Sequence, residues 1–121
     1  MVRRVQTVRV ARVYDEPSPE DGARVLVDRL WPRGLRRELA QLDSWCRTVA
    51  PSAELRVWYG HDPQLFGEFC ERYRAELAAA ECQAALEGLR SMGGVVTLLT
   101  ATAAIDISHA VVLAGVLRSL G

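Results

Sequence analysis

The chain has 121 residues, of which 50% are hydrophobic; this suits a single domain, residues 1–121, with one core, and it excludes two domains. Its 15 basic residues, all arginine, balance 15 acidic ones, and this composition is the opposite of that of a disordered chain. No apolar run approaches the ~20 residues that a bilayer span needs, and Met1–Gln6 lacks the apolar stretch of a signal peptide, so we expect a cytoplasmic protein with no membrane partner.

Two strands and a turn are predicted in the first part of the chain. Residues 7–14 alternate apolar and polar side chains, which is typical of a half-buried strand near a sheet edge. Residues 24–30 form a β-branched run that predicts an interior strand, ended by the turn at 31–34. The link over 15–23 is shorter than the dozen or so residues of a usual parallel crossover. An antiparallel, hairpin-like link is therefore the local expectation, with the orientation left open.

Helical spacing dominates the middle of the chain. An amphipathic helix is predicted over 38–49, with apolar residues three and four apart, and a short one over 52–58 with Ser52 as its N-cap. Asp62 followed by Pro63 predicts the start of a helix reaching about residue 80. A further helix over 82–92 ends at two glycines.

A nearly continuously apolar run over 95–101 predicts a central strand that is covered on both faces. A last helix follows, capped by Asp106 or Ser108 and reaching Leu120. This order of strands and helices predicts an α/β domain with a small sheet of three to four strands flanked by helices.

Polar residues follow two of the predicted strands. Asp28, Arg29 and Arg33 come at the end of one, with Trp31 between them as a further candidate ligand contact. Ligands of open α/β sheets bind outside the carboxyl ends of strands. The other strand leads to the candidates Thr100, Ser108 and His109. Because a helix N-terminus favours an anion, an arginine beside the last helix would complete an anion site.

Each of these residues also has a structural interpretation. Asp28 and one arginine could form a buried ion pair that fixes the turn at 31–34. His109 could be a hydrogen-bonded structural residue, although its pKa near neutrality keeps it available as a proton carrier. The tryptophans could simply pack in the core, while Trp58 and Tyr59 could form the floor of a pocket for a planar ligand.

Other chemistry has little support in the sequence. There are two histidines, without metal-ligand spacing, and three cysteines without a CxxC pair, so we expect no metal, no disulfide framework and no cofactor. Residues 1–37 carry nine arginines against five acids, and the rest of the chain carries six against ten. The sequence pI of about 6.7 is not that of a general nucleic-acid-binding domain, so no nucleic-acid partner is expected.

The sequence resembles the YeaO-like branch of domain-of-unknown-function family 488 from about residue 8 to 120. The most specific motif is Asp28-Arg29-Leu30-Trp31-Pro32-Arg33-Gly34, and supporting segments include residues 12–15, 17–22, 50–52, 60–63, 97–99 and 109–113. The resemblance implies a small bacterial cytosolic α/β protein, without implying a particular reaction.

This chain departs from the wider family at its site. In that family a cysteine often matches Thr100, and another often precedes the histidine matching His109; here these positions hold Thr100 and Ser108. Thiol chemistry therefore does not transfer to this chain. The charged residues usual in the preceding loop are replaced by Ala103-Ala104-Ile105.

Two functions from different classes remain. In the first, which we favour because no nucleophile and base stand at a suitable spacing, the protein binds a small anionic ligand through Arg29 and Arg33. In the second, it is a hydrolase or transferase acting on a small phosphorylated or carboxylated substrate, with Asp28 or His109 as proton carrier.

Overall fold

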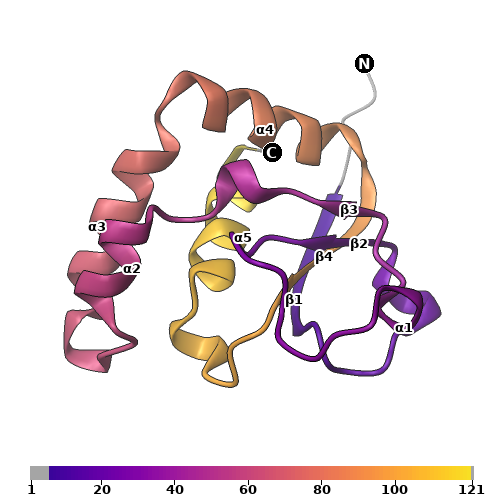
Figure 1. Cartoon of the computed structure of the whole chain (residues 1–121). Helices are drawn as coiled ribbons and strands as arrows, with labels where there is room; N and C mark the ends of the chain where they lie inside the picture. The colour runs from indigo at the N-terminus through magenta and orange to yellow at the C-terminus, as the bar shows by residue number, and fades with distance from the viewer. Residues whose placement is uncertain (1–5, 121) are drawn as a thin grey trace, which may run out of the picture.

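The computed structural model describes residues 6–120 and shows an α/β fold around a four-stranded parallel sheet (Figure 1). The strands are β1 (Gln6–Arg12), β2 (Ala23–Leu26), β3 (Ser44–Trp45) and β4 (Gly94–Thr100), in the order β1-β4-β2-β3. The predicted edge strand and the predicted central strand are both confirmed. Because all pairs are parallel, the carboxyl ends of the four strands meet at one edge of the sheet.

The expected antiparallel link between the first two strands is wrong. β1 and β2 do not pair with each other, because β4 lies between them and runs parallel to both. The link passes against β4 through a short 3-10 helix, η1 (Pro19–Asp21). Gly22, with a φ of 62°, lies so close to β4 that an added Cβ would be 2.1 Å from the Val95 carbonyl oxygen. A link this close to the sheet needs no crossover helix.

Four helices cover one face of the sheet. They are α2 (Ala53–Tyr59), α3 (Phe66–Leu77), α4 (Ala80–Ser91) and α5 (His109–Leu120). Ser52 caps α2 as predicted, accepting a hydrogen bond from the Leu55 amide, and Asp62 caps the 3-10 helix η3 (Pro63–Leu65) that leads into α3. Their apolar faces form the main core with β2 and β4. None of the described helices has the length and apolar character needed to cross a bilayer.

The long helix predicted over 38–49 is wrong. The chain forms only α1 (Arg37–Ala40), which ends at Gln41 in the left-handed conformation, then β3, then the 3-10 helix η2 (Arg47–Val49). The reason is backbone pairing with β2, because Asp43 N donates to Arg24 O and Cys46 N donates to Leu26 O, each at 2.8 Å. These sheet bonds replace the i to i−4 bonds that a continuous helix would have made.

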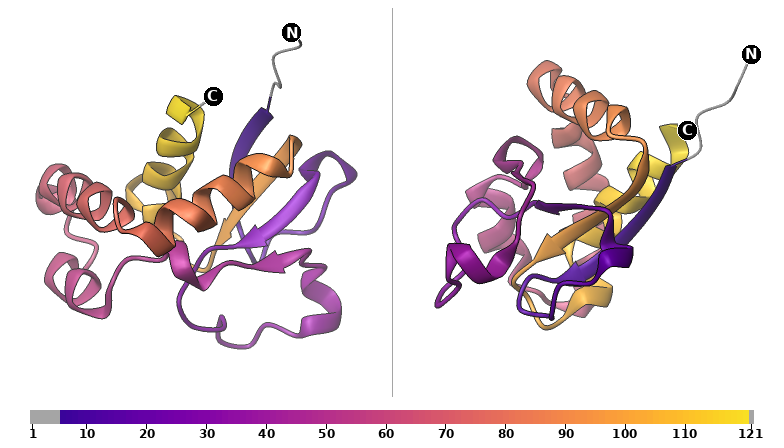
Figure 2. Two further views of the ribbon diagram at one scale, coloured as in Figure 1. Left: turned by 90° about the horizontal axis from the view of Figure 1, so that it is seen from above. Right: turned by 90° about the vertical axis from the view of Figure 1, so that its right-hand side faces the viewer.

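The second face of the sheet is covered by the segment between β2 and β3. Leu26, Leu99 and Val13 form a small core there, against which Trp31 and Trp45 pack among others. Figure 2 shows α5 and the α1 segment on opposite sides of the sheet. Both faces of β4 are therefore buried, as its apolar run predicted.

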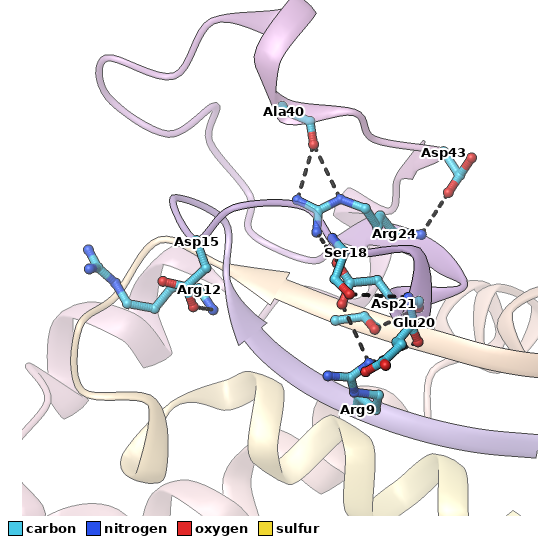
Figure 3. Close-up of polar contacts among 10 residues, drawn as sticks. Arg9, Arg12, Asp15, Ser18, Glu20, Asp21, Arg24, Ala40 and Asp43 are labelled. Carbon is cyan, nitrogen blue, oxygen red and sulfur yellow. Dashed lines mark hydrogen bonds and ion pairs between the residues drawn. The ribbon is translucent and has the colours of Figure 1, made fainter.

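A buried ion pair joins η1 to β2, and its arginine also holds the covering segment (Figure 3). Arg24 and Asp21 are only 5% and 6% exposed, and Arg24 Nη1 lies 2.5 Å from Asp21 Oδ2. Arg24 Nη2 also donates to the Ala40 carbonyl at 3.1 Å, which holds α1 in place. The pKa of Asp21 is lowered, first by the hydrogen bond from the Ser18 amide and then by Arg24.

We expect Arg24→Met to lower the free energy of unfolding by about 3–5 kcal/mol, because it leaves Asp21 buried without its main partner. The control is Arg90→Met, which breaks the solvent-exposed pair with Glu87 on α4 and should cost less than about 1 kcal/mol. Urea denaturation of both variants measures the difference. Equal losses in the two variants would contradict a structural role for the buried pair.

Candidate functional site

A cavity of about 650 Å³ opens at the carboxyl ends of β2 and β4. It is bounded by the turn after β2, the first residues after β4, helix α2 and the start of α5. Six of the seven residues that the sequence suggested line it together: Asp28, Arg29, Trp31, Arg33, Thr100 and His109. Its volume falls within the range of small-molecule sites.

Asp28 connects the elements that form the floor of this cavity. Its Oδ1 accepts a hydrogen bond from the Thr100 hydroxyl and its Oδ2 accepts one from the Ala101 amide, both at 2.8 Å. Its Oδ1 also lies 3.4 Å from His109 Nε2. The alternative in which Asp28 forms an ion pair with an arginine is not realised, since its partners in the described part of the chain are these three residues and Trp45, which donates to its backbone carbonyl.

His109 is mostly buried, with its side chain 14% exposed. Burial lowers its pKa, and this effect outweighs the opposing influences of Asp28 and of the hydrogen bond with Val27. The imidazole is therefore neutral at pH 7. Its Nε2 lies 3.0 Å from the Val27 carbonyl oxygen. Because a carbonyl can only accept, the neutral ring must carry its proton on Nε2.

Three arginines surround the cavity without a carboxylate partner among residues 6–120. Arg29 donates through Nε and Nη2 to the Pro51 carbonyl, both at 3.3 Å. The guanidinium groups of Arg33 and Arg56 make no hydrogen bond or ion pair with any described residue. Nothing in the sequence singles out Arg56, because its position in a helical segment does not show which face of α2 lies against the cavity.

Aromatic residues from two parts of the chain line the site. Trp31 lines the cavity, donates from Nε1 to the Leu35 carbonyl, and carries the Arg37 guanidinium 4.6 Å from its ring centre. Tyr59 lines the cavity as well, stacked on Phe69 with 4.2 Å between ring centres. Trp58 does not line the cavity and instead packs under the Arg72 guanidinium. Tyr59 alone therefore contributes to the floor that we expected Trp58 and Tyr59 to form.

Ser108 is the predicted site residue that the structure places apart from the others. It is fully buried, does not line the cavity, and its hydroxyl has no hydrogen-bond partner in the described part of the chain. It therefore does not cap α5 through its side chain either. The cavity has instead His61 in its wall, in the left-handed conformation that follows α2.

Two of the three hydroxyl groups that line the cavity donate hydrogen bonds within the protein, while the third, that of Thr102, accepts one from the Ala104 amide. Thr100 donates to Asp28, and the Tyr59 hydroxyl donates to the Ile107 carbonyl at 2.7 Å. Within residues 6–120 no group of three histidine, cysteine, aspartate or glutamate side chains is placed to hold a metal ion. Arg29, Arg33 and Arg56 contribute positive charge to the lining.

Comparison with known proteins gives consistent results along the whole chain. The model described as the inactive DUF488-N3 subclade matches residues 7–120. The uncharacterized proteins Rv3073c of Mycobacterium tuberculosis and Mb3100c of Mycobacterium bovis are each 52% identical over 120 residues, covering 98% of both chains. The uncharacterized protein YeaO of Escherichia coli is 39% identical over 113 residues, covering 93% of this chain and 98% of its own. No solved structure matches the chain.

The burial of neutral His109 predicts a dependence of stability on pH. Its pKa is lower in the folded than in the unfolded chain, so the unfolded chain binds the proton first as the pH falls below about 6.5. Below this pH, the contribution of His109 should lower the free energy of unfolding by up to about 1.4 kcal/mol for each pH unit. Above about pH 6.5, its contribution should be constant. Urea denaturation at pH 7.5 and 5.5 measures it.

A His109→Gln variant should lose this part of the pH dependence. The matched control is His61→Asn, which keeps His109 and places a residue tolerant of the left-handed conformation at position 61. If the parent and the His109→Gln variant respond identically to pH, His109 is not buried in its neutral form.

Proposed function

The chain belongs to the inactive DUF488-N3 subclade, and from this premise we propose that it binds a small anionic ligand in the cavity at the carboxyl ends of β2 and β4. The ligand is held by Arg29, Arg33 and Arg56. The protein binds it without carrying out a reaction.

The observation that carries this proposal is the uncompensated positive charge of the cavity. Three arginines line it against a single carboxylate, that of Asp28. Asp28 is engaged by Thr100, Ala101 and His109 rather than by an arginine. Guanidinium groups bind carboxylate or phosphate through paired hydrogen bonds, so an anion would supply the partners that Arg33 and Arg56 lack.

The competing function is that of a hydrolase or transferase in which Asp28 or His109 moves a proton. The 3.4 Å contact between their side chains supports it. Two features favour binding instead: both Asp28 oxygens already accept hydrogen bonds, and His109 Nε2 donates to the Val27 carbonyl. The description of the family as inactive agrees with this preference.

We also propose that the protein works in the cytoplasm. Its three cysteines, Cys46, Cys70 and Cys82, are all free thiols. Free thiols without disulfides are typical of proteins in a reducing compartment.

The proposal predicts that anions stabilise the folded protein. A suitable anion, drawn from inorganic phosphate, sugar phosphates, nucleotides and small carboxylates, should raise the free energy of unfolding by about 2.7 kcal/mol at 100 times its dissociation constant. Arg33→Gln and Arg56→Gln should each reduce this stabilisation, because each removes one positive partner. Thermal shift assays screen the anions, and denaturation measures the gain.

The control is Arg90→Gln on α4, which lies away from the cavity and should respond to the anion as the parent does. The binding proposal fails if no anion stabilises the parent. It also fails if an anion stabilises the Arg33→Gln and Arg56→Gln variants as much as it stabilises the parent. Turnover of a phosphate or carboxylate ester that is lost in His109→Gln would establish the competing enzymatic function instead.

A further inference from the structure

The cavity has an apolar part as well as a charged one. Leu30 and Val57 lie on its rim and are 65% and 81% exposed. Below them, Tyr59 and Phe69 are stacked and almost fully buried. The rim residues follow Arg29 and Arg56 directly in the chain. Charged and apolar groups are thus interleaved around one opening.

Inorganic anions would leave this apolar surface unused. Small-molecule sites are lined mostly by apolar side chains, which contact the apolar part of the ligand. The cavity has a volume of about 650 Å³, whereas one water molecule takes up about 30 Å³ of the liquid, so a single inorganic anion without its hydration shell would fill only part of it. When an inorganic anion is bound to the arginines, part of the cavity volume and its apolar surface therefore remain unoccupied.

Charge complementarity limits what can fill the remaining space. A neutral apolar ligand would leave Arg56, whose Nε is buried and has no hydrogen-bond partner among the described residues, without a partner in the site. A ligand with several charges spread over its length would place polar groups against Leu30 and Val57. Only a ligand with one charged end and one apolar end satisfies both parts of the lining.

We propose that the ligand is a small organic anion with a phosphate or carboxylate head and an apolar body, the head bound by the arginines and the body by Leu30 and Val57. This inference rests on the proposed anion-binding function and adds the nature of the ligand's other half. The apolar body provides affinity through the burial of apolar surface, while the arginines select for charge.

Calorimetric titration with matched probes tests the idea. Phenyl phosphate, butyl phosphate, inorganic phosphate and phenol separate the contribution of the head from that of the body. We expect phenyl phosphate or butyl phosphate to bind at least about tenfold more tightly than inorganic phosphate, and phenol to bind more weakly than phenyl phosphate. Comparison of the two esters shows whether the body is aromatic or aliphatic.

A matched pair of variants locates the apolar contact. Leu30→Ser should weaken the binding of the tighter ester by about three- to tenfold and change that of inorganic phosphate by less than about twofold. Leu39→Ser, which removes a side chain of similar exposure (64%) outside the cavity, should leave both affinities unchanged.

The possible results distinguish a failure of the inference about the apolar body from a failure of the proposed anion-binding function. If inorganic phosphate binds with dependence on Arg56 but neither ester binds more tightly, the apolar half is wrong and anion binding stands. If none of these probes binds and no anion of the thermal shift screen stabilises the protein, anion binding itself is wrong. Equal binding of phenol and phenyl phosphate would also overturn the requirement for charge.

Discussion

The arrangement of the site depends on the hydrogen bonds of one carboxylate. Asp28 stands just beyond the end of β2 and accepts hydrogen bonds from Thr100 and Ala101, at the end of β4. Its side chain also touches His109 at the start of α5, and its backbone carbonyl accepts a bond from Trp45 in β3. A partly buried carboxylate is stable only with such partners. Asp28 therefore fixes the ends of three strands and one helix relative to one another. The arginines line the cavity that these ends enclose.

The elements that could be predicted from the sequence are those whose pattern is local. β4 is apolar except for Thr97 and Thr100, and the caps Ser52 of α2 and Asp62 of η3 mark where the helical segments begin. The segment 38–49 has helical spacing too, yet its backbone pairs with β2, and spacing alone cannot show that a neighbouring strand offers hydrogen bonds. The direction of β2 could not be predicted for the same reason. β2 pairs in parallel with β4, which lies some 70 residues later in the chain.

The part of the candidate site that could be predicted from the sequence consists of the polar residues at the carboxyl ends of strands. Asp28, Arg29 and Arg33 come after β2 and Thr100 ends β4, so the edge rule for parallel sheets brings them together. Arg56 was not predicted as a site residue, because its position at the cavity depends on how α2 packs against the rest of the protein. Ser108 was misplaced for a related reason: adjacent residues at a helix start point in different directions, and here His109 faces the cavity while Ser108 is enclosed.

The order of strands has a consequence for how the chain folds. The central strand is the last to be synthesised, and it pairs with β1 across a separation of nearly 90 residues, from Gln6 to Gly94. Contacts of such high sequence separation form slowly, because loop closure must precede their gain. On the ribosome, β1 and β2 must wait for their common neighbour until β4 (Gly94–Thr100) has emerged. β1 therefore stays without its sheet partner during the synthesis of all the residues between them.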